Sequence, residues 1–236
     1  MILGIETATS ALSVALVEKG GILRSMRHDA TNAHDELLAP LCRDILQEHG
    51  STAGDLTGIA VSAGPGSFTG LRIGLAVAKG MALALDIPLA LVPTLDSLAF
   101  AASRAVSVEM HEELLVLLPS RKNEMYAAAY EFARNSWTAR SPVSVLHTEE
   151  IEAAIKKCAY IAGYASADIL DVAQREHVTP LENITADATY IALLGEEMLS
   201  RVDAADTDTC EPLYVQQFEV KQAKHTLFRR KETDGD

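Results

Sequence analysis

One stretch of the chain constrains the fold more than any other, because it joins a short apolar run, a glycine-rich loop and a long apolar segment. Residues 58–62 are typical of a buried strand, residues 63–70 of a loop, and residues 71–85 of a helix. In that helix Arg72 and Lys79 are the only charged residues. A helix that is apolar almost all round must be covered on more than one side. This segment therefore predicts a layered fold in which the helix lies against a sheet.

The rest of the chain alternates in the same way between strand and helix patterns. Aromatic residues make up only 5% of the chain, whereas Ala, Leu, Val and Ile dominate, which favours α/β architecture over an aromatic-rich sandwich. Strands are expected at 2–6, 12–18, after Gly21, and at 88–92, 114–118, 124–132 and 158–162; helices are expected at 34–50, 94–104, 148–157, 165–175 and 186–201. We divide the chain into a first domain at 1–108, a second at 109–221, and a mobile tail at 222–236.

The two helices of the first domain suggest a surface for another protein. In the helix at 34–50 apolar residues recur on one face, and in the helix at 71–85 small residues recur every four positions, which leaves a shallow ridge that a partner helix could approach. Packing of this ridge within the chain itself is the alternative. The residues predicted for the partner interface are Leu37, Leu38, Leu41, Ile45, Leu71, Gly74, Leu75 and Ala78.

Charge and cysteine usage narrow the functional classes. The formal net charge is −13, from 33 acidic and 20 basic residues, so we expect weak binding of RNA by the chain alone. The acidity could instead serve a basic partner, or only solubility. Cys42, Cys158 and Cys210 form no CxxC motif, which favours reduced structural thiols. No run of 18 uncharged apolar residues and no basic leader are present, so a cytoplasmic location without membrane contact is expected.

A weak phosphate-binding pattern lies where the first strand and the glycine-rich loop end. Backbone amides of such a loop, together with the dipole of the following helix, can hold an anion. The loop matches neither the GxxxxGK[ST] nor the GxGxxG spacing, and a tight turn that starts the helix is the simpler explanation. The residues that this loop hypothesis names are Glu6, Thr7, Gly64, Gly66 and Ser67.

Three segments, in this order and spacing, carry a specific resemblance: LGIETAT near the start, GIAVSAGPGSFTGLRIGLAVAKGMAL from Gly58, and PTLDSLAFAA from Pro93. They resemble the TsaB (YeaZ) family of bacterial proteins, closely up to about residue 102. The resemblance implies two ribonuclease-H-like subdomains of the actin, sugar kinase and heat-shock ATPase superfamily, with mixed sheets flanked by helices.

The family's implied role is that of a non-catalytic partner. Its members assist a TsaD-like catalytic subunit, with a TsaE-like ATPase, in placing threonylcarbamoyl on N6 of the adenosine next to the anticodon of tRNA. The resemblance thus implies a protein that is not itself an enzyme and that meets tRNA only through the complex. A homodimer of the isolated chain is compatible with this role.

Two later motifs match the family in part. A strand motif similar to DARxGEVYxxxY is matched by Arg121, Glu124, Tyr126 and Tyr130, but Pro119 and Asn123 depart from it. A second motif, PxYxR, is matched by Pro212 and Tyr214, while Gln216 replaces the arginine. For the matching residues, strand packing and surface charge pairing are the alternatives to a functional role.

Two other functions of the same superfamily remain as alternatives. A small-molecule kinase would need a second phosphate loop and a catalytic acid, and the second domain shows neither pattern. A glycoprotease-like metallopeptidase would need ligand histidines, but the histidines form neither HxxxH nor HExxH. Glu6 is followed by no second acid, which weakens a hard-cation site. We therefore expect no catalytic residue, no metal and no required cofactor, with at most weak ATP or ADP binding.

Overall fold

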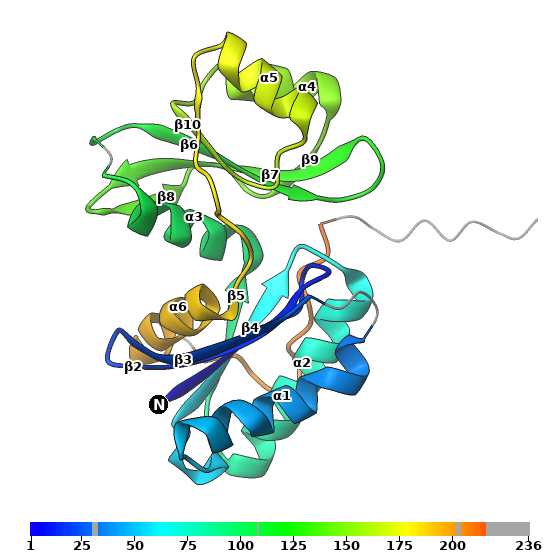
Figure 1. The fold of residues 1–236 in the computed structure, drawn as a ribbon, viewed down its shortest axis with the longest axis vertical. Coiled ribbons are helices and arrows are strands. Elements are labelled where there is room, and N and C mark those ends of the chain that lie inside the picture. Colours follow the sequence, from blue (N-terminus) through cyan, green and yellow to red (C-terminus); the bar gives the residue numbers. More distant parts are fainter. Residues whose placement is uncertain (30–32, 108, 202–203, 216–236) are drawn as a thin grey trace, which may run out of the picture.

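The chain forms two subdomains, each a mixed sheet with helices on both faces (Figure 1). The computed structural model describes residues 1–29, 33–107, 109–201 and 204–215, so the tail expected at 222–236 lies outside the described residues. The first sheet has the order β3-β2-β1-β4-β5 and is built from β1 (Ile2–Glu6), β2 (Leu12–Glu18), β3 (Gly21–His28), β4 (Gly58–Gly64) and β5 (Leu89–Pro93). β1 runs antiparallel to β2 and parallel to β4.

The second sheet has the order β11-β10-β6-β7-β8, and one further strand, β9, pairs with β7. Its strands are β6 (Glu113–Pro119), β7 (Glu124–Ala133), β8 (Ser136–Ala139), β9 (Ser144–His147), β10 (Tyr160–Gly163) and β11 (Thr179–Pro180). β6 is antiparallel to β7 and parallel to β10. The α/β class with mixed sheets flanked by helices is thus confirmed.

The first sheet is covered on both faces, which explains why β1, β2, β4 and β5 are apolar without alternation, whereas the edge strand β3 is largely exposed. Leu3 and Ile5 share a core with the two helices on one face, α1 (His34–His49) and α2 (Phe68–Leu85). Ile2 faces the opposite side, where it packs with α6 (Ala188–Ser200). A short 3₁₀ turn at Ala53–Asp55 connects α1 to β4.

The second sheet is covered by α3 (Thr94–Ala105) on one face and by α4 (Thr148–Ile155) and α5 (Ala167–Arg175) on the other. Leu95 and Leu98 of α3 pack with Val116 and Tyr130 of this sheet. The hydroxyl of Tyr130 donates a 2.7 Å hydrogen bond to Oδ1 of Asp96, so α3 is also held by a polar contact.

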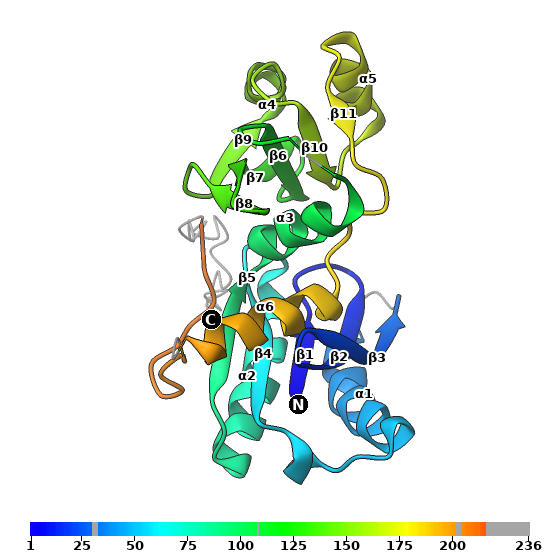
Figure 2. The ribbon, with the colours of Figure 1, turned by 90° about the vertical axis from the view of Figure 1, so that its left-hand side faces the viewer.

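The positions of α3 and α6 do not agree with a division of the chain into domains 1–108 and 109–221. α3 precedes that boundary but packs on the second sheet, and α6 follows it but packs on the first. The two helices lie side by side where the subdomains meet (Figures 1 and 2). Hydrophobic periodicity predicts that a helix buries one face but not which sheet it covers, so a cut by sequence order assigned both helices to the wrong subdomain.

The segment after α6, residues 204–215, stays on the first subdomain and contacts β5, β4 and α2. We call it the C-terminal strap. Its backbone donates hydrogen bonds from Ala205 N to Leu89 O at 2.8 Å and from Leu213 N to Ala63 O at 2.7 Å. The ammonium group of Lys79 donates to the carbonyl of Cys210 at 3.3 Å. The strap therefore covers a side of α2 that the sheet does not reach.

The strap explains how so apolar a helix is accommodated in a small subdomain. By length and composition alone α2 could cross a membrane, features that it shares with core helices of folded domains. Here one side packs on the sheet, and Phe68 and Arg72 lie under Tyr214 of the strap. The ring centroids of Phe68 and Tyr214 are 5.2 Å apart, and Arg72 Nε donates to the tyrosine hydroxyl at 3.0 Å.

Candidate functional site

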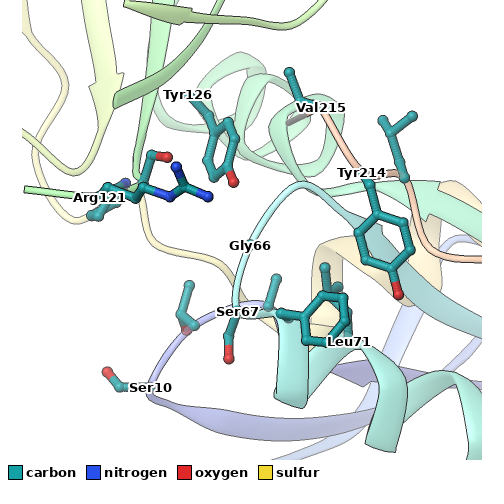
Figure 3. A pocket seen from close by; sticks show the side chains of 14 residues that line it. Ser10, Gly66, Ser67, Leu71, Arg121, Tyr126, Tyr214 and Val215 are labelled. Atoms are coloured by element: carbon teal, nitrogen blue, oxygen red, sulfur yellow. The ribbon is translucent and has the colours of Figure 1, made fainter. Parts of the chain in front are cut away.

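A cavity of about 430 Å³ opens between the two subdomains (Figure 3). The first subdomain contributes Thr9 and Ser10 from the loop after β1, and Gly66 and Ser67 from the loop before α2. The second subdomain contributes Arg121 from the β6–β7 turn together with Tyr126 of β7, and the strap adds Leu213, Tyr214 and Val215. Segments far apart in the sequence thus form one site.

The glycines of the loop before α2 are required by close packing against the loop after β1. A Cβ on Gly66 would fall 2.4 Å from the carbonyl oxygen of Ala8, and one on Gly70 would fall 2.1 Å from that of Thr7. Ser67 N donates to Ala8 O at 2.7 Å, and Ser67 Oγ accepts from Gly70 N at 3.2 Å as the cap of α2. The structure thus supports the turn that starts a helix, and it leaves Ser67 at the cavity wall.

Glu6 and Thr7 lie beneath this wall rather than in it. Both side chains are fully buried, and neither lines the cavity. Oε1 of Glu6 accepts a hydrogen bond from Ala8 N, whereas Oε2 finds no partner among the described residues. Burial raises the pKa of Glu6 to about 7, against the lowering effect of the Ala8 amide. This carboxylate is sealed from a ligand in the cavity.

Gly64 packs against the strap and does not line the cavity. Its backbone has a φ of 106°, and a Cβ there would fall 2.9 Å from the carbonyl oxygen of Leu213. Of the five residues in the loop hypothesis, only Gly66 and Ser67 therefore reach the cavity. The residue types alone could not show which residues of the loop after β1 and the loop before α2 face the cavity and which are buried.

The family strand motif falls at the β6–β7 turn. Arg121 and Tyr126 line the cavity, and Glu124 begins β7 but is not in the cavity wall. Asn123, which departs from the family's glycine, has a φ of 63°. Asparagine is one of the few residues that adopt this left-handed conformation readily, so the turn keeps its shape. The departure at Gln216 lies outside the described residues.

Several residues of the cavity wall, such as Ser10 and Ser120, are not among the predicted site residues, and Tyr214 is another. The sequence places Tyr214 only in the PxYxR motif, and nothing in its neighbourhood indicates that it contacts α2. Its hydroxyl accepts from Arg72, 142 positions earlier in the chain, and it lies across the cavity from Tyr126 (Figure 3). Such a contact becomes visible only once the strap has been placed.

Most of the residues predicted for the partner interface are buried inside the first subdomain. Leu38, Ile45, Leu71 and Ala78 are at most 1% exposed, and Leu75 is also buried in the core. A Cβ on Gly74 would fall 2.2 Å from Thr7 Oγ1. The expectation that a partner helix approaches the ridge at Gly74 and Ala78 is therefore wrong for this fold, because that ridge packs on the loop after β1 and on the sheet.

Two members of the predicted set, Leu37 and Leu41, keep part of their surface exposed on α1. On α2 the exposed positions beyond Arg72 are Ala76, Gly80, Leu83 and Ala84, and Leu83 is 59% exposed. We call this surface the α1–α2 face. Its α2 part is apolar beyond Arg72, and Leu37 and Leu41 pack against the core of the first subdomain.

Among the described residues, no group of three or more His, Cys, Asp or Glu side chains could hold a metal ion. The cysteines at 42, 158 and 210 are free thiols, and burial raises the pKa of Cys42 to about 12. A low reactivity of this buried thiol follows from that shift.

Comparison with known proteins agrees with this arrangement. Residues 8–172 match the family model of TsaD, tRNA N6-adenosine threonylcarbamoyltransferase. The tRNA threonylcarbamoyladenosine biosynthesis protein TsaB of Escherichia coli is 36% identical over 66% of this chain. The matched region spans only 62% of that relative.

Solved structures give the same result at the level of the fold. YeaZ from Pseudomonas aeruginosa superimposes with a TM-score of 0.72 at 25% identity, over 90% of this chain and 98% of that one. The ROK hexokinase from Thermus thermophilus reaches 0.50 at 10% identity, over 85% of this chain and 99% of that one, a likeness of fold alone. The class of fold is thus one that YeaZ and this ROK hexokinase share.

The family match extends over more than half of the chain, which places it among the TsaD-type proteins of this class. Within them, the chain belongs to the TsaB (YeaZ) family, because it is 31% identical to TsaB of Buchnera aphidicola subsp. Schizaphis graminum over 66% of this chain and 73% of that relative.

Proposed function

We propose that this chain is a non-catalytic accessory subunit in the biosynthesis of threonylcarbamoyladenosine in tRNA. In this role a TsaD-type subunit transfers the threonylcarbamoyl group to N6 of the adenosine next to the anticodon, and a TsaE-type ATPase takes part. The similarity to a tRNA threonylcarbamoyladenosine biosynthesis protein and to the threonylcarbamoyltransferase family supports this role. The chain would act in the cytoplasm, where tRNA is modified.

The observation that carries the proposal is the α1–α2 face. Between Arg72 and Asp86 the helix α2 bears a single charge, at Lys79, and this charge is engaged by the strap. Beyond Arg72, the exposed positions of α2 are therefore Ala76, Gly80, Leu83 and Ala84, and none of them is charged. A surface of this kind favours a partner with a matching apolar helix, since small residues permit close approach of two helices.

An accessory role is also supported by the site between the subdomains. An actin-like ATPase needs a carboxylate that can face a metal-bound phosphate, but Glu6 is buried and does not line the cavity. The described lining residues include no Asp or Glu. A hard divalent cation prefers carboxylate oxygens, so this wall suits metal-dependent phosphoryl chemistry poorly.

The net charge of the chain affects how the chain would bind tRNA. At a net charge of −13 the averaged field repels a polyanion, so the chain would meet tRNA within the complex and not alone. The same field would favour a basic partner surface.

A mixing experiment tests the proposal. The purified chain is combined with the cognate TsaD-type subunit, and the product is analysed by size-exclusion chromatography with light scattering. We expect a stoichiometric heterocomplex, and we expect threonylcarbamoyl transfer to tRNA to require both subunits. Full transfer activity by the TsaD-type subunit without this chain, or by this chain alone, would contradict the proposal.

A further inference from the structure

Basic residues are concentrated near the end of the sequence. Residues 1–215 contain 29 acidic and 15 basic residues, whereas residues 221–231 contain five basic residues and no acidic residue. The five are Lys221, Lys224, Arg229, Arg230 and Lys231. A short block of Lys and Arg of this density is typical of arms that bind nucleic acid. We call residues 221–231, which lie outside the described residues, the basic arm.

The basic residues of the described part of the chain are mostly bound to groups of the chain itself. Six of them form salt bridges with carboxylates: Arg24, Arg27, Arg43, Arg140, Lys156 and Arg201. Lys79 donates to the carbonyl of Cys210, and Arg72 donates to the hydroxyl of Tyr214. A phosphate at any of these positions would compete with an acceptor that is already in place. The described surface therefore provides little free positive charge for a polyanion.

The turn between β6 and β7 is an exception. Arg121 and Lys122 are exposed there, and neither forms a salt bridge with another described residue. Arg121 lines the same cavity as Val215, the last described residue of the strap (Figure 3). Residues 216–231, at up to roughly 3.5 Å each, can reach about 55 Å from Val215. The basic arm can therefore contact the same RNA molecule as these two cations.

We propose that the basic arm binds the phosphate backbone of tRNA within the heterocomplex, with Lys122 as a further contact. Lysine and arginine hold phosphate groups by charge, and such contacts carry no sequence information. The basic arm therefore adds affinity for tRNA, whereas the choice of the adenosine is left to the TsaD-type subunit. This inference rests on the proposed function, which supplies tRNA as the nucleic acid. The net charge of −13 still opposes tight binding by the chain alone.

Binding of full-length tRNA by the purified heterocomplex tests the inference, measured by filter binding at several salt concentrations. The arm variant carries Lys221→Gln, Lys224→Gln, Arg229→Gln, Arg230→Gln and Lys231→Gln in the full chain. Each phosphate contact contributes about 0.7–0.9 to the slope of log affinity against log salt concentration, so the slope should fall by up to about 4. At low salt the dissociation constant should rise about tenfold or more. Lys122→Gln alone should lower the slope by about 1.

A second set of five charges supplies the matched control. The control variant replaces exposed basic residues outside the β6–β7 turn and the strap by Gln: Arg134, Lys156, Lys157, Arg175 and Arg201. It changes the net charge by the same amount as the arm variant, so an effect of the averaged field would weaken tRNA binding equally in both. We expect instead that only the arm variant loses affinity and slope, and that both variants form the heterocomplex and melt as the wild type does.

Four outcomes would overturn the inference. Equal tRNA affinities of the arm and control variants would mean that the basic arm makes no phosphate contact, and would leave the accessory role untouched. Loss of heterocomplex formation in the arm variant alone, measured by light scattering, would assign the arm to the partner protein instead of RNA. A lower melting temperature of the arm variant alone would assign it to the acidic surface of its own chain. Failure of the wild-type chain to form a heterocomplex would overturn the accessory role and this inference together.

Discussion

Gly74 of α2 packs directly against Thr7, so that a Cβ built on the glycine would lie 2.2 Å from the threonine Oγ1. Thr7 is fully buried at the end of β1, and its hydroxyl finds no hydrogen-bond partner among the described residues. The closeness of this contact fixes the distance between α2 and the loop that forms one wall of the cavity.

The first prediction concerns this contact. Substitution Gly74→Ala should lower the free energy of unfolding by about 1–3 kcal/mol, because the added methyl group overpacks the contact with Thr7. Gly80→Ala is the control in the same helix, since a Cβ there meets nothing within 4 Å. It should raise stability by about 0.5–1 kcal/mol through helix propensity. Urea unfolding measures both, and a gain of stability in both variants would refute the packing argument.

The second prediction concerns the polar contact that holds α3 on the second sheet. Tyr130→Phe removes the donor to Asp96, whose pKa burial already raises. An unsatisfied buried group costs about 1–3 kcal/mol, so the variant should unfold at a lower urea concentration. Tyr190→Phe, where the ring packs on Phe100, should change stability less. Equal losses in both variants would show that the hydrogen bond is unimportant.

The third prediction is a pH dependence from Glu6. Its pKa is raised from 4.5 to about 7 by burial, so between these values the folded chain keeps a proton that the unfolded chain releases. Stability should therefore fall as pH rises through this window, by roughly 3 kcal/mol at 1.36 kcal/mol per pKa unit. Glu6→Gln keeps the shape without the charge.

Thermal unfolding of the wild type and of Glu6→Gln from pH 5 to pH 8 checks this dependence. The two melting temperatures should be closest near pH 5, and the variant should be the more stable near pH 8. Parallel curves over the whole range would mean that Glu6 does not titrate in this window.

The fourth prediction tests the α1–α2 face. Leu83 is 59% exposed, so Leu83→Glu should leave the melting temperature of the chain nearly unchanged. In a dry interface an unpaired carboxylate is strongly unfavourable, and heterocomplex affinity should fall at least tenfold. Leu23→Glu on β3, where the leucine is 41% exposed, is the matched control and should keep wild-type affinity. If Leu23→Glu lowered the heterocomplex affinity and Leu83→Glu did not, the interface would lie at the edge of the first sheet.

Much of the fold could be predicted because periodicity is a local property. The helix expected at 34–50 is α1 at His34–His49, and the strand expected at 2–6 is β1 at Ile2–Glu6. The short strands β8, β9 and β11 were not predicted, since two to four residues give no readable alternation. Small residues every four positions correctly indicated close approach along α2, but the approaching element is the loop at Thr7 and not a partner.

The site was harder to predict than the fold, because it depends on which segments meet. Gly66, Ser67, Arg121 and Tyr126 were each singled out, but for different reasons and in different domains. Only the folded chain shows that they line one cavity and that Tyr214 completes it. Sequence reasoning also could not reveal that Glu6, four residues before Ser10, is sealed while Ser10 is accessible.

The exchange of α3 and α6 between the subdomains also bears on how the chain folds during synthesis. When residue 107 has left the ribosome, the first sheet has all its strands, but the face that α6 covers is still bare. The apolar side chains on that face, Ile2, Val17 and Val92 among them, remain unprotected until residues 188–200 have been made. A nascent chain of this kind offers a binding site for a chaperone until residue 200 has been made, and a fragment ending at residue 108 would be expected to aggregate.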